Sequence, residues 1–258
     1  MTVFVGTSGW QYRDWREAFY PRGVAQARWL DYYASRFPTV EVNNTFYRLP
    51  PASTFEKWHD GTPDDFLVAV KASRYLTHIK RLQNPGQSVA LLLERAKPLR
   101  EKLGPILVQL PPSLRVDIDA LDATLRAFKK TKVAFEPRHE SWFSEEVYAL
   151  LRDHDAALCL TDRLSRPGPI ARTASWFYLR FHEGTASPHP CYGPHALTTW
   201  AGRLRDLWGE RAEGYVYFNN DGRSCAPRDA ARFARDCEKV RFDVARTPDP
   251  RDCALAHR

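Results

Sequence analysis

Short apolar runs recur along the chain, and most of them end in a polar or charged side chain. Helix-length segments separate most of these runs, so each run is expected to form one strand. About eight strands that alternate with helices are typical of an α/β protein with a TIM-like (β/α)8 barrel. The expected strands lie at 3–5, 39–42, 66–70, 106–108, 133–135, 157–160, 176–179 and 215–218.

The polar residues at the ends of these runs define the expected functional site. In a TIM-like barrel the carboxyl ends of all strands meet around one mouth, where active sites form. Residues that are far apart in the sequence are therefore expected to face one concave pocket. They are Thr7, Glu41, Asn43, Lys71, Gln109, Glu136, Asp162, Arg180, His182, Asn219 and Asn220.

Helical periods mark two of the connecting segments. An apolar stripe from Ile118 to Phe128 follows Asp117, which predicts an amphipathic helix with Asp117 as its N-cap. A longer helix is expected over 89–103, with a kink at Pro98 because proline interrupts the helical hydrogen bonds.

Three segments depart from the regular pattern. The stretch Arg166-Pro167-Gly168-Pro169 leaves no room for a normal helix, so an irregular unit is expected between strands six and seven. Pro227 is typical of the first position of a helix and predicts where the last helix opens. Residues 241–258 are poor in apolar side chains and are expected to form a flexible tail. The sequence therefore predicts a single barrel domain over 1–240, followed by this tail.

Composition agrees with one soluble domain. The chain has 258 residues, 43% of them hydrophobic, and a barrel of roughly 250 residues is normally a single domain. No basic region precedes an apolar stretch at the start, and no apolar run approaches the ~18 residues of a membrane span. The five cysteines are an odd number without a C-x-x-C pair, so neither a disulfide framework nor a thiolate zinc site is indicated. A cytoplasmic protein without membrane contact is expected.

The formal net charge of +7 favours anionic partners. Charge alone does not separate nucleic acid from phosphorylated metabolites. No compact metal-ligand spacing such as H-E-x-x-H occurs, so no metal ligand is assigned. The sequence indicates neither a cofactor nor an oligomeric state.

Ordered motifs at the strand ends extend from Val3 to Glu238 and resemble one family. They include Gly6-Thr7-Ser8-Gly9-Trp10, Glu41-Val42-Asn43-Asn44-Thr45-Phe46-Tyr47, Gln109-Leu110-Pro111-Pro112, Phe135-Glu136-Pro137-Arg138, Tyr178-Leu179-Arg180-Phe181-His182 and Tyr217-Phe218-Asn219-Asn220. Together they resemble the YecE-like domain of unknown function. The resemblance implies a barrel similar to those of endonuclease IV-type DNA-repair enzymes, and no established reaction. Two departures from the family pattern, Glu183 after His182 and Asp229 in place of a common asparagine, concern the seventh and eighth loops.

Two residues are candidates for proton transfer. Glu136 is expected at a strand end inside the mouth, where a carboxylate can act as a general acid or base. The alternative is that Glu136 forms a structural ion pair with Arg138. His182 is expected to assist proton transfer, because imidazole titrates near neutral pH, although a lone histidine is more often structural.

Charged, amide and aromatic side chains are expected to hold the ligand. Lys71 and Arg180 place positive charge at two strand ends, which suits a phosphate or a carboxylate. The alternative is that they neutralise Glu41, Glu136 and Asp162 within the mouth. Amides would orient the ligand, and aromatic rings would stack on a base or a sugar. The remaining candidate binding residues are Trp10, Asn43, Tyr47, Gln109, Arg138 and Asn219.

The sequence therefore predicts a polar, net-basic pocket that binds a phosphorylated or nucleotide-like ligand, and it leaves open whether a hydrolase or lyase reaction follows. One alternative is a glycosidase that uses Glu41 and Glu136 as its carboxylate pair, for which the separation of the two carboxyl groups is the test. Another alternative is a non-catalytic module that binds nucleic acid with steeply salt-dependent affinity.

Overall fold

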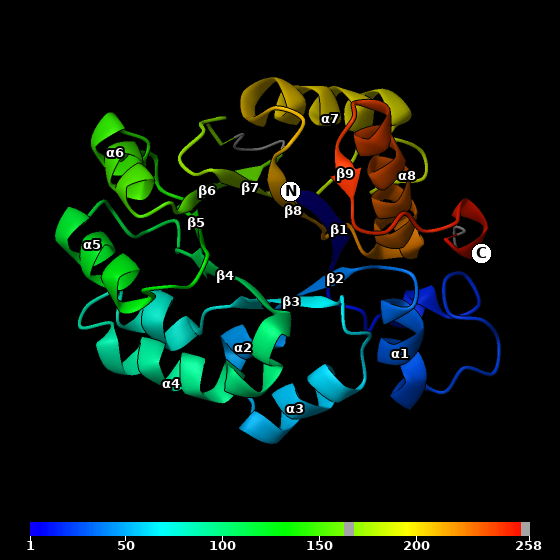
Figure 1. The fold of residues 1–258 in the computed structure, drawn as a ribbon, viewed down its shortest axis with the longest axis horizontal. Helices are drawn as coiled ribbons and strands as arrows, with labels where there is room; N and C mark the ends of the chain where they lie inside the picture. Colours follow the sequence, from blue (N-terminus) through cyan, green and yellow to red (C-terminus); the bar gives the residue numbers. More distant parts are fainter. Residues whose placement is uncertain (163–167, 254–258) are drawn as a thin grey trace.

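The structure, a computed structural model, describes residues 1–162 and 168–253. Eight parallel strands close into a barrel, and helices surround it (Figure 1). This arrangement confirms the TIM-like (β/α)8 fold that the strand pattern predicts. The barrel strands are β1 (Thr2–Ser8), β2 (Thr39–Val42), β3 (Leu67–Lys71), β4 (Leu103–Gln109), β5 (Val133–Glu136), β6 (Ala157–Thr161), β7 (Trp176–Phe181) and β8 (Glu213–Phe218).

Two of the strand pairings around the barrel are short. β1 pairs with β2, and β5 pairs with β6, through two residue pairs each, whereas β7 pairs with β8 through six. In the order of the strands these two pairings lie opposite each other. They divide the barrel into one group of strands from β2 to β5 and a second group formed by β6, β7, β8 and β1.

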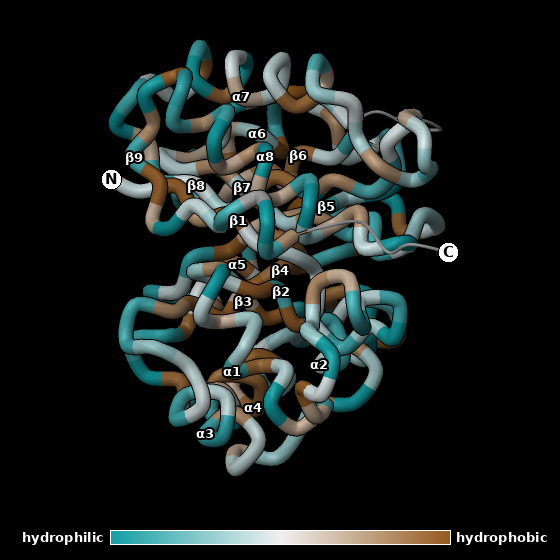
Figure 2. Tube along the Cα trace, turned by 90° about the vertical axis from the view of Figure 1, so that its right-hand side faces the viewer, coloured by the Kyte–Doolittle hydropathy of each residue, from teal (hydrophilic) through white to brown (hydrophobic). Residues whose placement is uncertain are grey.

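The helices cover the outside of the barrel, where hydrophilic residues are concentrated on the outer surface and hydrophobic residues on the strands (Figure 2). They are α1 (Trp29–Ala34), α3 (Ala52–Asp60), α4 (Gly86–Ala96), α5 (Ile118–Ala127), α6 (Glu145–Asp153), α7 (Pro194–Trp208) and α8 (Cys225–Lys239). The short helix α2 (Asn44–Tyr47) instead follows β2 at the face where the strands end. The expected N-cap of α5 is confirmed, because the Asp117 carboxylate accepts a hydrogen bond from the Ala120 N–H at 3.0 Å.

Two helix boundaries differ from the sequence-based expectation. The helix expected over 89–103 ends at Ala96, and a 3-10 segment, Lys97–Lys102, follows it. Pro98 lies in that segment. Because proline lacks the N–H that a continuing α-helix needs, the α-helix ends before it. The last helix opens earlier than expected, and Pro227 is its third residue rather than its first.

The connection between β6 and β7 is irregular, as expected, in its described part. Residues 168–175 contain no helix, while Arg166 and Pro167 of the expected loop lie outside the described residues. The Thr173 hydroxyl fixes this connection, because it accepts the Leu158 N–H at 2.7 Å. A side-chain oxygen thereby satisfies a backbone donor near the start of β6.

Residues 241–253 pack against the barrel instead of extending as a flexible tail. Phe242 and Cys253 are buried in the core. A ninth strand, β9 (Asp243–Val244), lies parallel to the start of β1, and Arg246 forms an ion pair with Asp65 at 2.6 Å. The rest of the expected tail lies outside the described residues.

The barrel interior is filled unevenly. Large rings on β7 and β8 face small side chains on β3, β5 and β6, as the layered packing of such barrels requires. Because side chains alternate along a strand, Trp176 and Tyr178 point inward and Arg180 continues the same series. The interior cluster comprises Ala69, Leu107, Ala134, Ala157, Cys159, Ala174, Trp176, Tyr178, Tyr215 and Tyr217.

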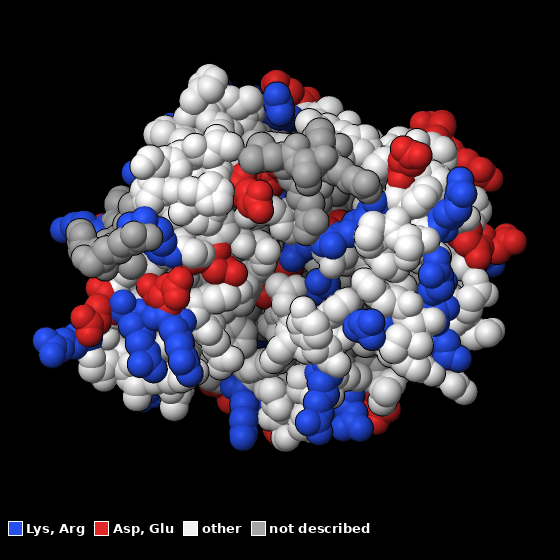
Figure 3. All heavy atoms as spheres, turned by 180° about the vertical axis from the view of Figure 1, so that it is seen from behind, with Lys and Arg blue, Asp and Glu red and all other residues white. Residues whose placement is uncertain are grey.

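The carboxyl ends of the strands open on one face of the molecule. In Figure 2 the N-terminus, which precedes β1, lies on the left, and α2, which follows β2, lies on the right. The strands therefore run toward the face that Figure 3 shows. That face is hollowed near its centre, with Lys and Arg side chains on one side of the hollow and acidic side chains on the other (Figure 3). We call this hollow, into which the carboxyl strand ends point, the mouth.

Candidate functional site

A buried ion-pair network of Glu41, Arg180 and Glu136, which we call the central triad, joins three strands at the base of the mouth. Arg180 NH2 donates to Glu41 Oε1, and Arg180 NH1 donates to Glu136 Oε2, both at 2.8 Å. All three side chains are buried. The two terminal nitrogens of the planar guanidinium thus serve two carboxylates, one on β2 and one on β5.

Neutral donors complete the Glu41 end of the triad. Ser8 Oγ donates to Glu41 Oε1 at 2.8 Å, and the Tyr178 hydroxyl donates to Oε2 at 2.7 Å. Asn43 Nδ2 adds a third bond, to Oε1, at 3.1 Å. A buried carboxylate is tolerated only where its oxygens accept enough hydrogen bonds. These three donors therefore make the buried position of Glu41 possible.

Gln109 and Arg138 join Arg180 as hydrogen-bond donors to Glu136. Gln109 Nε2 lies 2.8 Å from both of its oxygens, and Arg138 Nε and NH2 lie 3.3 Å from Oε1. Burial alone would raise the pKa of Glu136, but Arg180 and Arg138 outweigh burial and lower the pKa to about 2. Efficient general acids and bases have a pKa near the operating pH. The geometry therefore favours Glu136 as an ionised anchor for two guanidinium groups.

Lys71 lies at the end of β3, next to the central triad, and forms no salt bridge within the described part of the chain. Its Nζ lies 4.4 Å from the centre of the Phe46 ring, in a cation–π contact. Burial and the positive charge of Arg180 lower the pKa of Lys71 to about 8. A fraction of this amine is therefore uncharged near neutral pH.

His182 and Asp162 form a second polar group, at the ends of β7 and β6. The His182 backbone N–H donates to Asp162 Oδ1 at 2.8 Å, and the Tyr192 hydroxyl donates to Oδ2. Asn219 Nδ2 lies 3.5 Å from His182 Nδ1. Burial raises the pKa of Asp162 to about 6. This carboxyl, unlike Glu136, titrates close to neutral pH.

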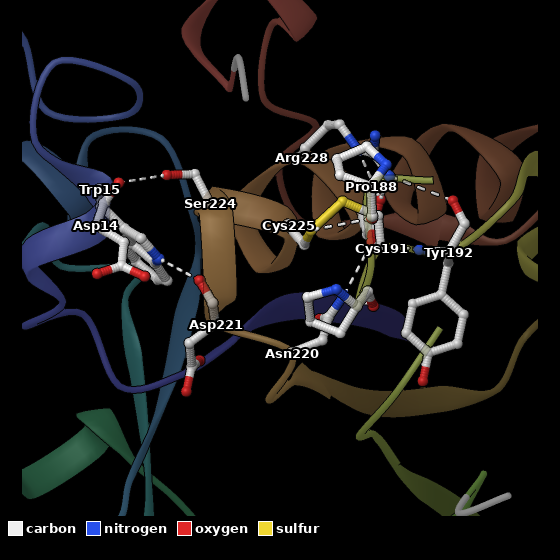
Figure 4. The surroundings of a disulfide bond; sticks show 12 residues. Asp14, Trp15, Pro188, Cys191, Tyr192, Asn220, Asp221, Ser224, Cys225 and Arg228 are labelled. Atoms are coloured by element: carbon white, nitrogen blue, oxygen red, sulfur yellow. Dashed lines mark hydrogen bonds and ion pairs between the residues drawn. A yellow bond between two sulfur atoms is a disulfide. The ribbon is translucent and has the colours of Figure 1, made fainter. Parts of the chain in front are cut away.

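A disulfide between Cys191 and Cys225 ties the loop after β7 to the start of α8 (Figure 4). The sequence-based expectation of no disulfide is wrong, because 34 positions separate these cysteines and only the fold brings them together. The free cysteines Cys159, Cys237 and Cys253 are all buried.

Asp229, one of the two departures from the family pattern, holds the same loop. Its Oδ2 accepts the Tyr192 N–H at 2.8 Å and the Asn220 side-chain amide at 2.9 Å. Its Oδ1 pairs with Arg228 at 2.6 Å, and these partners surround the disulfide (Figure 4). An asparagine would supply the acceptor but not the charge for Arg228. Glu183, the other departure, is exposed.

The candidate aromatic residues lie in different environments. Trp10 is buried and packs edge-on against Trp58, with 5.9 Å between the ring centres, so it supports the loop after β1. Tyr47 is 81% exposed at the end of α2. It lines a cavity of about 700 Å³ that includes Tyr75 and Lys80 of the segment after β3. Of these two candidates, only Tyr47 offers a ring to a ligand.

Thr7 was expected to face the mouth, but its side chain points to the helical layer. Thr7 Oγ1 lies 3.0 Å from the hydroxyl of Tyr33, which belongs to α1 in the helical layer. The neighbouring Ser8 faces inward and bonds to Glu41. Tyr178 was also missed as a site residue. The alternation of side chains along β1 and β7 is the signal that identifies both inward-facing residues.

Asp221 is a further residue of the mouth that the sequence analysis missed. It follows Asn220 after β8, and burial raises its pKa to about 8. Its Oδ1 has no hydrogen-bond partner among the described residues. The indole N–H of Trp15 donates to its backbone carbonyl at 3.1 Å and holds the residue in place (Figure 4). A carboxyl after two asparagines gives no signal of its burial.

The structure thus brings most of the candidate residues to one face in two groups. Asn43, Lys71, Gln109, Glu136, Arg138 and Arg180 surround or form the central triad, and His182 and Asn219 belong to the neighbouring group. Within residues 1–162 and 168–253, no three His, Cys, Asp or Glu side chains converge in a way suited to a metal ion.

Comparison with known proteins identifies the family. The family described as "Protein of unknown function DUF72" matches residues 4–252. The chain belongs to the DUF72 family. The UPF0759 protein YunF of Bacillus subtilis (strain 168) is 30% identical over 57% of this chain and 54% of its own length. The UPF0759 protein YecE of Escherichia coli (strain K12) is 29% identical over 67% of this chain and 63% of its own length. The resemblance to YecE is confirmed, although the match spans less than two thirds of either relative.

Solved structures of DUF72 proteins share this fold. A DUF72 family protein from Thermotoga maritima MSB8 has a TM-score of 0.80 and 28% identity, covering 92% of this chain and 100% of that chain. One from Enterococcus faecalis V583 has a TM-score of 0.77 at 20% identity, over 92% and 96% of the two chains. A xylose isomerase-like TIM barrel fused to 4-hydroxyphenylpyruvate dioxygenase shares the fold alone, with a TM-score of 0.56 at 15% identity. For DUF72 itself, fold and family are established, and a reaction is not.

Proposed function

We propose that the mouth binds a phosphorylated or nucleotide-like ligand through its anionic group. The observation that carries this proposal is a surplus of cations around the central triad. Lys71, Arg138 and Arg180 lie near the carboxylates Glu41 and Glu136, and burial raises the pKa of the nearby Asp221 carboxyl to about 8, so Asp221 adds little negative charge at neutral pH. Arg180 uses both terminal nitrogens on the two carboxylates. Positive charge at Lys71 and Arg138 is therefore left for a ligand, and a low-dielectric hollow strengthens its attraction for an anion.

The contacts suggest different roles for the candidate residues. Arg138 keeps 26% of its side chain exposed and makes only long hydrogen bonds to Glu136, so it can turn one edge of its guanidinium toward an anion. Gln109 and Glu136 position the two arginines. If a hydrolase or lyase reaction takes place here, Asp162 beside His182 is the better acid or base, because burial raises its pKa to about 6.

The geometry weighs against the glycosidase alternative. Glycosidases keep the space between their two carboxyl groups for the sugar and, in inverting enzymes, for a water. Here the Arg180 guanidinium occupies the space between Glu41 and Glu136, 2.8 Å from an oxygen of each. A Glu136 carboxyl with a pKa of about 2 also stays ionised and cannot serve as the general acid at neutral pH.

Calorimetric titration of the protein with inorganic phosphate and with adenosine monophosphate tests the proposal. Replacing Arg138→Gln removes a charge-assisted hydrogen bond worth about 1.5 to 3 kcal/mol, so affinity should fall roughly 10- to 100-fold. Lys129→Met, which removes an exposed cation from the end of the α5 region, should leave the affinity unchanged. Equal affinity in the wild type and both variants, or no binding at low salt, would overturn the proposal.

The same titration distinguishes a non-catalytic nucleic-acid-binding module from a site for one phosphorylated ligand. A single-stranded oligonucleotide neutralises several phosphates at once, so its affinity for a nucleic-acid module falls steeply with salt. A ligand that places one anionic group in the mouth shows a shallow salt dependence. An oligonucleotide that binds far more tightly than the mononucleotide, with a steep slope, would favour the non-catalytic module.

We also propose a cytoplasmic location. None of the helices in the described ranges combines the length and apolar character that crossing a membrane requires. The Cys191–Cys225 disulfide stands against this location, because the cytoplasm keeps most thiols reduced. Acid quenching of intact cells, followed by alkylation of the denatured protein and mass spectrometry, decides the point, because both cysteines are buried in the folded protein. Alkylated Cys191 and Cys225 support the cytoplasm, and a protected disulfide supports an oxidising compartment.

A further inference from the structure

Two buried lysines among the described residues have opposite surroundings. Lys102 Nζ donates to the His59 carbonyl at 2.7 Å and to the Thr62 carbonyl at 2.8 Å, so its charge is solvated by the backbone. Lys71 is 9% exposed, and its Nζ makes neither a hydrogen bond nor an ion pair within the described residues. Lys102 is a structural lysine, whereas Lys71 is held at a strand end of the mouth without a fixed partner.

The charged groups that face Lys71 come from several elements. Arg180 on β7 and Arg138 after β5 repel a positive charge on its amine, whereas Glu41 on β2 and Glu136 on β5 attract it. Both carboxylates are already bonded to Arg180. Together with burial, the two arginines prevail and lower the pKa of Lys71 to about 8.

His78 is the remaining titratable neighbour of Lys71. Its ring packs edge-on against Phe46 with 4.9 Å between the centres, and the Phe46 ring also carries Lys71 Nζ. Burial, then Arg74 and Lys71, lower the pKa of His78, so a neutral imidazole is favoured there. His78 belongs to a π-helix, Tyr75–Ile79, a distortion that is common at functional sites.

We propose that Lys71 is a nucleophile that forms a Schiff base with the carbonyl carbon of a phosphorylated aldehyde or ketone. This inference rests on the proposed function, because Arg138 holds the anionic group of the same ligand. A lysine that only attracted an anion would gain from remaining fully charged. Desolvation without a carboxylate partner instead lowers the pKa of a lysine, so that more of its amine is uncharged. An uncharged, desolvated amine is the form that attacks carbonyl compounds.

The step balances without a redox partner. The neutral ε-amine of Lys71 attacks the carbonyl carbon, and the carbonyl oxygen takes up a proton to give a carbinolamine. In forming this carbinolamine the nitrogen gives up one proton. The carbinolamine hydroxyl then takes up a second proton, the carbon–oxygen bond breaks as the nitrogen electron pair forms the carbon–nitrogen double bond, water leaves, and the nitrogen loses its second proton. The products are the imine and one water molecule. The neutral His78 imidazole is the neighbouring group that can accept the proton of the amine.

Reductive trapping tests the inference on the full-length protein. Pyridoxal 5′-phosphate serves as the probe because it is a phosphorylated aldehyde, and borohydride converts its imine with lysine into a stable secondary amine. At pH 7 a pKa of about 8 leaves a roughly 300-fold larger uncharged fraction than the ordinary value of 10.5. Peptide mass spectrometry should therefore find saturable labelling at Lys71, well ahead of exposed lysines such as Lys129, and inorganic phosphate should compete with it.

Matched variants separate charge from nucleophilicity. Lys71→Arg keeps the cation and should retain phosphate binding within a few-fold, but it should lose the fast labelling phase. Lys71→Met should lose the labelling and weaken phosphate binding, and it serves as the second variant if the arginine does not fold. Lys129→Met should behave like the wild type in both assays.

The outcomes distinguish this inference from the proposed function. Labelling spread evenly over exposed lysines, with phosphate still bound in the calorimeter, overturns the Schiff-base inference and leaves anion binding intact. Absence of phosphate binding and of phosphate competition overturns the proposed function. Fast labelling in Lys71→Arg at another lysine would also refute the assignment of Lys71.

Discussion

Replacing Glu136→Gln tests whether this residue anchors the central triad or transfers protons. Glutamine keeps the shape of the side chain and removes its charge. The change leaves Arg180 with one carboxylate instead of two and Arg138 with none at 3.3 Å. It also places an amide group opposite Gln109 Nε2, which donates to both oxygens of the native carboxylate.

The expected loss of stability follows from the pKa of Glu136. Arg180 and Arg138 lower it to about 2 against the opposing effect of burial, and the value for an unfolded chain is roughly 4.3. A difference of about two units corresponds to roughly 3 kcal/mol at neutral pH. Breaking a buried ion pair costs about 3 to 5 kcal/mol. We expect Glu136→Gln to lose about 3 kcal/mol, or about 6 to 12 °C in Tm for a domain of this size.

The pH dependence gives the prediction a second signature. The folded-state pKa of Glu136 lies below its unfolded value, so its stabilisation is complete above about pH 4.3 and is lost as the pH falls toward 2. The wild type should lose this contribution over that range, and the variant has none to lose. Urea unfolding followed by circular dichroism should therefore show a gap at pH 7 that narrows as the pH falls below 4.

An exposed carboxylate provides the control. Glu56 on α3 is exposed, and Glu56→Gln should change the unfolding free energy by less than ~0.5 kcal/mol. The anchor assignment is refuted if Glu136→Gln is as stable as the wild type at pH 7. If that stable variant also lost a measured activity by ~10² to 10⁴-fold, Glu136 would be the acid or base that the sequence analysis predicts.

Three other perturbations test separate features of the fold. Reducing Cys191–Cys225 with a dithiol should lower Tm by roughly 10 °C, because closing a loop of this length stabilises by about 3 to 4 kcal/mol; an unchanged melting curve contradicts this. Asp221→Asn should match the wild type near pH 4 and become the more stable protein as the pH rises toward 8, since burial raises the pKa of Asp221 to about 8 and the folded wild type then resists ionisation. Coincident stability–pH curves from urea unfolding would refute it. Deleting residues 241–258 should lower the urea midpoint, because it removes the buried Phe242 and β9, and an equal midpoint would show that this packing is dispensable.

The strand pattern predicts the barrel because each strand is a local feature. The run at 133–135 becomes β5 with Glu136 at its carboxyl end, and parallel strands in a barrel all end at the same face. The common direction of the parallel strands is therefore enough to bring Lys71, Glu136 and Arg180 to one mouth. Period-two alternation within β7 would also have identified Tyr178.

The roles of these residues depend on distances that the sequence does not contain. A carboxylate at a strand end has the same sequence signal whether it is a catalytic acid or, as at Glu136, the partner of Arg180 and Arg138. The disulfide was missed for the same reason, because α7 and β8 lie between Cys191 and Cys225 in the sequence and only the fold brings the two cysteines together. The packing of Phe242 was missed because the tail was predicted from its low apolar content, and one buried ring in a polar segment changes that content little.

Because two strand pairings are short, the central triad also connects the two groups of strands that these pairings separate. Glu41 lies on β2 and Glu136 on β5, which are the outer strands of one group of four, and Arg180 lies on β7 in the other group. The Arg180 guanidinium therefore bonds one group of strands to the other, and both of its carboxylate partners lie on strands that border a junction of two residue pairs. Subglobal opening, in which a protein comes apart along its least stable contacts, should then begin with the release of Arg180. The edge amides of β2 and β5 would exchange hydrogen through this opening, while the six-pair ladder between β7 and β8 stays closed until the whole barrel unfolds.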